Sequence, residues 1–74
     1  MTGSVYNIIE LVGSSKNSWE EAAQNAIAAA SKKLTNIRIA RIAELDAKLE
    51  GGRIVEYRAK IMLSFKVEIE PETL

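Results

Sequence analysis

The chain has 74 residues with no cysteine and no histidine, and its ten basic residues balance ten acidic ones. A domain this short buries about 60% of the surface that its unfolded chain exposes, so it needs disulfides, a metal or oligomerisation for stability. Because disulfides and the ordinary zinc sites require Cys or His, we expect a homo-oligomer. A net charge of zero without a basic stripe also argues against nucleic-acid binding.

The apolar runs are short and are interrupted by charged residues, so we expect no membrane-spanning segment. The first residues, Met1 to Ser4, lack the charged and apolar regions of a signal peptide. We therefore expect one domain over residues 1–74 in a cytoplasmic protein that contacts neither nucleic acid nor membrane.

Residues 5–12 are predicted to form a strand, because apolar side chains alternate along the segment and occupy both of its faces. Such a strand is expected to be covered on each side. Residues 13–17 read Gly-Ser-Ser-Lys-Asn and predict a turn.

Ser18 and Glu21 predict the start of a helix through a capping box, in which the Ser18 hydroxyl caps the helix and the Glu21 carboxylate reaches back to Ser18. The helix is expected to run to about Lys33, with Lys32 and Lys33 at the negative end of its dipole. Its apolar stripe is mostly alanine, which allows a close approach to a sheet. The stripe comprises Trp19, Ala22, Ala23, Ala26, Ile27, Ala30 and Leu34.

A second strand is predicted from Ile37 to about Leu45, with an imperfect alternation of apolar and polar residues. In a regular strand, Arg41 would share its face with Ile37, Ile39, Ala43 and Leu45. A β-bulge or a charge that faces a ligand would explain that arginine.

Residues 55–69 carry the clearest alternation in the chain and predict a long third strand, which Pro71 ends. Gly51 and Gly52 predict a hairpin between the last two strands. The order β-α-β-β predicts an α+β fold, with an antiparallel hairpin and a helix across one face of the sheet. Solvent or another subunit is expected to cover the other face, which carries Arg58, Lys60 and Lys66.

The run Glu-Leu-Val-Gly-Ser-Ser-x-x-Ser-Trp-Glu-x-Ala at residues 10–22 resembles the opening of the dodecin family. The resemblance continues through Asn36-Ile37 and residues 57–65, so it covers nearly the whole chain. It implies a three-stranded antiparallel sheet wrapped around one long helix, in a hollow homododecamer. In well-known members, the implied function is the binding and storage of flavins as stacked pairs near two-fold axes.

Two positions depart from the flavin-binding pattern of that family. Where those members carry a flavin-stacking tryptophan this chain has Ile39, and where they carry a flavin-bonding glutamine it has Arg58. The loss of the aromatic platform removes stacking worth about 1 kcal/mol per contact. The arginine would fill the pocket or pair with a carboxylate such as Glu44. Residues 37–42, 57–58 and 64–66 look more similar to the calcium dodecin branch.

Ile39, Arg41 and Arg58 are the candidate ligand-binding residues, as the equivalents of the flavin-pocket region. The two arginines could grip a phosphate or carboxylate of a ligand, or form ion pairs between subunits. Glu44 and Asp46 are candidate metal ligands, since two carboxylates on one strand face could share a hard cation with symmetry copies. The alternative is that they are salt-bridged surface residues.

Without His or Cys, no nucleophile and base can be assembled, and we expect a protein that is not an enzyme. Trp19 is expected to pack against the sheet, with a ligand platform as the alternative. The favoured function is storage of a small ligand, with calcium as the candidate ion. Riboflavin or FMN storage in an altered pocket, with Arg58 contacting the flavin, is the alternative. A third possibility is a shell without a natural ligand.

Overall fold

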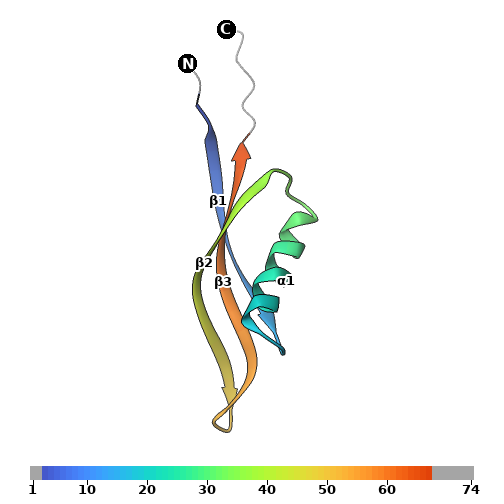
Figure 1. Cartoon of the computed structure of the whole chain (residues 1–74), viewed down its shortest axis with the longest axis vertical. Helices are drawn as coiled ribbons and strands as arrows, with labels where there is room; N and C mark the ends of the chain where they lie inside the picture. Colours follow the sequence, from blue (N-terminus) through green and yellow to red (C-terminus); the bar gives the residue numbers. More distant parts are fainter. Residues whose placement is uncertain (1–2, 68–74) are drawn as a thin grey trace.

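The computed structural model describes residues 3–67, which form three strands and one helix. The strands make one antiparallel sheet in the order β1-β3-β2, and α1 lies across one of its faces (Figure 1). This is the α+β arrangement that the sequence predicts. The elements in chain order are β1 (Val5–Ser15), α1 (Trp19–Ser31), β2 (Ile37–Glu50) and β3 (Arg53–Val67).

Two of the strands are longer than predicted. β1 continues through residues 13–15, which were expected in a turn, because they pair with residues 57–59 of β3. β2 passes Leu45 and ends at Glu50, next to a tight turn in which both glycines adopt positive φ. For β3, the predicted end at Ile69 and Pro71 lies outside the described residues.

At the start of the helix, one of the two hydrogen bonds of the predicted capping box is formed. The Ser18 hydroxyl accepts a hydrogen bond from the Glu21 N–H at 3.0 Å, as expected of an N-cap. The Glu21 carboxylate, however, does not return to Ser18. It accepts from the Ser15 hydroxyl at 3.0 Å and from the Asn17 amide, while Ser15 Oγ takes the Ser18 N–H at 3.3 Å. The serine at the end of β1 therefore replaces the second half of the box.

The helix ends at Ser31, earlier than predicted, and Lys32 is its C-cap. Neither Lys32 nor Lys33 lies in the last turn, so the predicted pairing with the helix dipole is not formed within the helix. Asn36 then adopts a φ of 64°, and its carbonyl accepts from the Lys66 N–H at 3.1 Å as β2 begins. Within residues 3–67, the helix is too short and too polar to cross a membrane.

The core lies between α1 and the centre of the sheet. Alanines at every fourth helix position meet the odd-numbered residues of β3, as the alanine stripe predicts. Gly13 makes the closest approach possible, because a Cβ there would collide with the Ala22 carbonyl oxygen and lie 2.9 Å from Ala26 Cβ. The buried apolar residues are Ala22, Ala26, Ala30, Ala59, Ile61 and Leu63.

Two β-bulges in β2 decide which of its side chains face the helix. The pairing with β3 skips Arg38 and Ala43, so each adds one residue to β2 without a counterpart on β3. The predicted bulge is thus present, but the predicted face is wrong. Ile37, Ala40, Ile42 and Leu45 lie on the helix side, while Ile39 lies with Arg41 on the opposite side.

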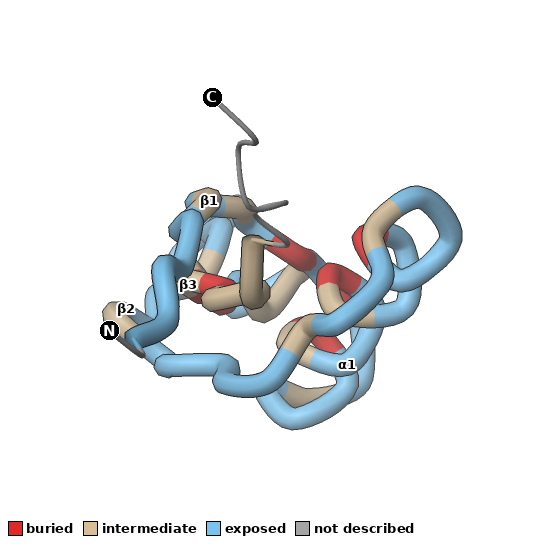
Figure 2. The backbone as a smooth tube through the Cα atoms, turned by 90° about the horizontal axis from the view of Figure 1, so that it is seen from above, coloured by how far each residue is buried: buried red, intermediate tan, exposed pale blue. Residues whose placement is uncertain are grey.

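The face of the sheet that points away from α1, here called the outer face, has no covering element within residues 3–67 (Figure 2). From the pairing register it carries ion pairs at its centre and apolar side chains beside them. Its exposed apolar residues are Tyr6, Ile8, Val12 and Ile39.

Candidate ligand-binding surface

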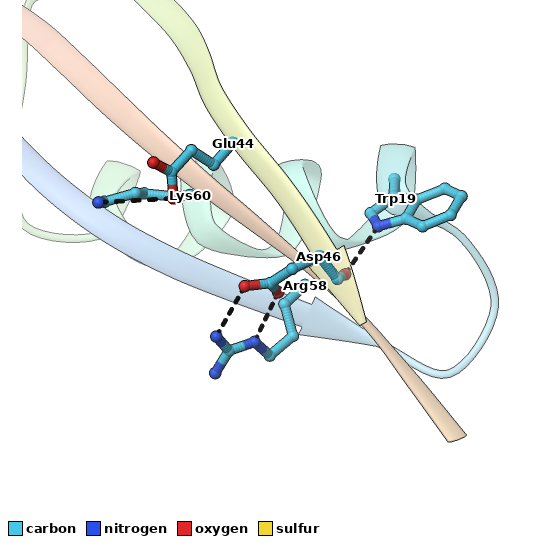
Figure 3. A network of polar contacts seen from close by, with 5 residues as sticks. All are labelled: Trp19, Glu44, Asp46, Arg58 and Lys60. Carbon is cyan, nitrogen blue, oxygen red and sulfur yellow. Dashed lines mark hydrogen bonds and ion pairs between the residues drawn. The ribbon is translucent and has the colours of Figure 1, made fainter. Parts of the chain in front are cut away.

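Arg58 and Asp46 form a bidentate ion pair on the outer face, directly opposite each other on β3 and β2 (Figure 3). Arg58 Nε and Nη2 donate to the two carboxylate oxygens at 2.8 and 2.9 Å. This hydrogen-bonded pair lowers the pKa of Asp46 below its ordinary value and raises that of Arg58. The carboxylate that holds Arg58 is therefore Asp46, and not the Glu44 suggested from the sequence.

Lys60 takes the next position on β3 and connects all three strands. Its ammonium lies 3.0 Å from the Glu10 carboxylate of β1 and 3.8 Å from that of Glu44 on β2. The hydrogen bond to Glu10 is the main reason that the pKa of Lys60 is raised. Glu44 is held more loosely, because 3.8 Å exceeds a hydrogen-bond distance.

Ile39 and Arg41 lie together on the outer face, opposite Ser64 and Met62. The Ile39 side chain is 58% exposed, and Arg41 makes no ion pair within 4 Å with any of the residues 3–67. Arg58 lies four residues before Met62 on β3, on the other side of the Lys60 row. The three candidate ligand-binding residues thus share one face, but the Lys60 row separates Arg58 from the other two within one chain.

Trp19 packs on the edge of the sheet at the start of α1. Its ring meets Tyr57 edge-to-face with centroids 4.7 Å apart, and its Nε1 donates to the Asp46 carbonyl at 2.9 Å (Figure 3). The predicted packing against the sheet is present, yet Trp19 stays 37% exposed and outside the buried core.

A groove of about 380 Å³ runs beside Trp19, between α1 and β2. The groove could not be predicted from the sequence, because a regular β2 would not place Ile42 on the helix side. The spacing of Ile42 and Leu45, at i and i+3, is the sequence signal that could have revealed the bulge. The lining residues are Trp19, Glu20, Ala23, Gln24, Ile27, Ile42 and Leu45.

Comparison with known proteins identifies the family. The family model for Dodecin matches residues 5–68. The chain belongs to the dodecin family. It is 39% identical over 64 residues to the calcium dodecin of Mycobacterium tuberculosis, covering 86% of this chain and 90% of that protein. It is 32% identical over 66 residues to the dodecin of Thermus thermophilus, covering 89% and 96% of the two chains.

Solved structures of dodecins share the fold. The crystal structure of M. tuberculosis calcium dodecin, described as having a novel calcium-binding site, superposes with a TM-score of 0.79 at 36% identity and covers 93% of this chain and 99% of its own. A T. thermophilus protein superposes with a TM-score of 0.85 at 31% identity, covering 92% and 100%. The sheet wrapped around one helix is therefore the dodecin fold.

The two carboxylates that the sequence proposes as metal ligands in this dodecin are neighbours on the outer face. Asp46 uses both of its oxygens on Arg58, and Glu44 lies near Lys60. Residues 3–67 contain no group of three carboxylates close enough to hold a metal ion together. Since calcium takes six to eight oxygen ligands, one chain alone does not fit a calcium shell.

Proposed function

We propose that this chain is a non-catalytic subunit of a homododecameric shell that binds and stores a small ligand without ordinary flavin stacking. The carrying observation is the pair of residues at the flavin-pocket positions. Ile39 offers no aromatic surface, and Arg58 is held against the sheet by both oxygens of Asp46. A ligand that needs a stacked ring and a free amide would meet neither.

Assembly into a shell is supported by the balance of buried and exposed apolar side chains. The core of residues 3–67 has only six buried apolar residues, and four of these are alanines. Large apolar side chains on both sides of the sheet remain exposed, which a lone domain of this size would not tolerate without cost. Burial against other copies removes that cost.

A cation such as calcium is the ligand that we propose to test first after the flavins. Glu44 supports it, because its carboxylate is exposed and loosely held by Lys60, so it is free to turn toward a metal. The remaining oxygen ligands would come from equivalent residues of other copies. The name of the calcium dodecin relative is consistent with this proposal.

The test is a titration of the dialysed protein with riboflavin and FMN, followed by flavin fluorescence, with the particle mass measured by light scattering. We expect a homododecameric mass and no quenching at stoichiometric protein. The double variant Ile39→Trp with Arg58→Gln should quench flavin fluorescence, because it restores the ring platform and the amide. Strong quenching by the parent protein would overturn the proposal in favour of flavin storage in an altered pocket.

A calorimetric titration with Ca²⁺ distinguishes a shell that binds this ion from a shell that does not. We expect heat of binding from the parent and its loss in Glu44→Gln, which keeps the shape but removes the charge. The variant Glu56→Gln, on the same face but outside the Lys60 row, is the control and should bind as the parent does. The absence of binding by the parent would leave a shell without this cation.

A further inference from the structure

Asp46 on β2 is hydrogen-bonded to two other elements of the fold. Its carboxylate accepts from Arg58 Nε and Nη2 of β3 at 2.8 and 2.9 Å. Its backbone carbonyl accepts from Trp19 Nε1, at the start of α1, at 2.9 Å (Figure 3). Since β2 is an edge strand, Trp19 supplies a partner that no neighbouring strand within residues 3–67 provides there. Asp46 is therefore held in place by β3 and α1 together.

The bulge at Ala43 sets the position of this carboxylate. After the skipped residue, Asp46 pairs with Arg58 on β3, and both side chains point to the outer face. Side chains directly opposite each other on antiparallel strands are close enough to interact. The two carboxylate oxygens then meet two N–H groups of the guanidinium in the bidentate arrangement that arginine favours.

The pair is exposed, so its main effect is not on stability. The Arg58 and Asp46 side chains are 47% and 53% exposed. Exposed ion pairs contribute little to the free energy of unfolding, because water and salt screen them. The pair does change the charge that a ligand meets, because a guanidinium beside a carboxylate attracts an anion less than a free guanidinium does. The N–H groups that the pair leaves free can still donate to a neutral oxygen.

Arg41 provides the contrast on the same face. It lies on β2 opposite Met62 and forms no ion pair with any of the residues 3–67. Arg41 and Arg58 are both exposed. The difference between them is the carboxylate that lies opposite Arg58. Of the two arginines that the sequence offers to an anion, Arg58 is therefore the one whose charge is already compensated.

We propose that Asp46 is a specificity-determining residue, which occupies Arg58 so that this part of the outer face accepts neutral or cationic groups and disfavours anions such as phosphates. The inference rests on the proposed function, because it names the chemical class of the small ligand group that meets Arg58. It gives Asp46 a role other than that of a metal ligand, since the carboxylate acts through the arginine that it holds.

The test is a calorimetric titration of the dialysed parent protein and of Asp46→Asn with inorganic pyrophosphate at low ionic strength. The variant keeps the size of the side chain and the backbone carbonyl but removes the charge. We expect it to bind pyrophosphate at least about fivefold more tightly than the parent, the effect of removing one unit charge about 4 Å away in water. Arg41 is present in both proteins, so binding there is common to both.

The fluorescence of Trp19, the single tryptophan of the chain, checks the fold of the variant. It should be unchanged, because the indole is bonded to the backbone of residue 46 and not to its side chain.

Glu56→Gln is the matched control, because it removes the same charge from the same face, two residues before Arg58, and leaves the ion pair in place. Its pyrophosphate affinity should stay within about twofold of the parent's. The double variant of Asp46→Asn with Arg58→Gln should lose the gain.

An Asp46→Asn affinity equal to that of the parent overturns the proposal. An equal gain in Glu56→Gln, or a gain that the double variant keeps, also overturns it, because the anion would then respond to net charge or lie elsewhere. Flavin quenching by the parent, in contrast, overturns the proposed function and leaves this comparison of pyrophosphate affinities intact.

Discussion

The two faces of the sheet differ in how their β3 side chains are removed from water or neutralised. On the helix-side face, Ala59, Ile61 and Leu63 of β3 are fully buried by a helix of the same chain. On the outer face, the intervening residues Arg58 and Lys60 are paired with carboxylates of the neighbouring strands, and Arg58 remains exposed while Lys60 is half-buried. The centre of the first face is therefore covered within one subunit, although Ile42 and Leu45 on β2 stay exposed, whereas the charges at the centre of the second face are paired in water.

Side chains on the two faces of the sheet differ in how far they can be substituted without loss of the fold. Side chains at the centre of the helix-side face are fixed by volume, because the alanines of α1 pack directly against the buried residues of β3. Side chains on the outer face are fixed by charge pairing in water, which contributes little to stability. Substitutions at exposed positions of the outer face, such as Ile39 and Arg58, should therefore leave the fold unchanged.

The largest loss of stability is expected from Gly13→Ala, which adds a methyl group on the helix-side face. The added methyl group would overlap with the Ala22 carbonyl and force the helix away from the sheet, at a cost of about 3 kcal/mol. Urea unfolding at one protein concentration measures it. Gly3→Ala, where no atom lies within 4 Å of the added carbon, should change the free energy of unfolding by less than about 0.5 kcal/mol. Equal stabilities of the two variants would contradict the close packing.

A smaller loss of stability is expected from Ser15→Ala, at the end of β1 on the helix-side face. The buried hydroxyl accepts the Asn17 N–H at 2.8 Å and donates to Glu21, so its removal leaves several groups unsatisfied and costs about 2 kcal/mol. The neighbouring Ser14→Ala removes an exposed hydroxyl from the outer face and should be nearly neutral. Thermal unfolding of the two variants in parallel distinguishes them, and a Ser14→Ala loss as large as that of Ser15→Ala would contradict the comparison.

The smallest change in stability is expected from Arg58→Gln, on the outer face. The arginine holds the pKa of Asp46 below its ordinary value, so the ion pair is present at neutral pH and is lost as the pH falls through that lowered pKa. The variant should move the pKa of Asp46 upward, as followed by NMR of the labelled carboxyl carbon. Lys66→Gln, on the same face, should leave it in place. An Asp46 pKa that does not move in Arg58→Gln would mean that the pair is absent in solution.

The sequence was sufficient to predict the order of elements and the core of the helix-side face. The alternation in β3 and the alanine spacing in α1 each depend on one periodicity, and both are confirmed, for β3 from Tyr57 to Phe65. A register shift in the pairing with β2 leaves Val55 without a counterpart. The faces of β2 could not be predicted, because the bulges at Arg38 and Ala43 are set by pairing with β3 and not by local preference. The choice of Asp46 over Glu44 as partner of Arg58 follows from the same shifted register.

The bulges also have a consequence for comparing relatives of this chain. A bulge residue can be deleted without moving its neighbours to the other face, whereas a deletion elsewhere in β2 would reverse every later side chain. Gaps of one residue between homologous sequences should therefore fall at Arg38 or Ala43, and an alignment that places them elsewhere will assign residues to the wrong face of β2. The residue of a relative that is matched to Ile39 depends on that placement, since Ile39 directly follows the first bulge.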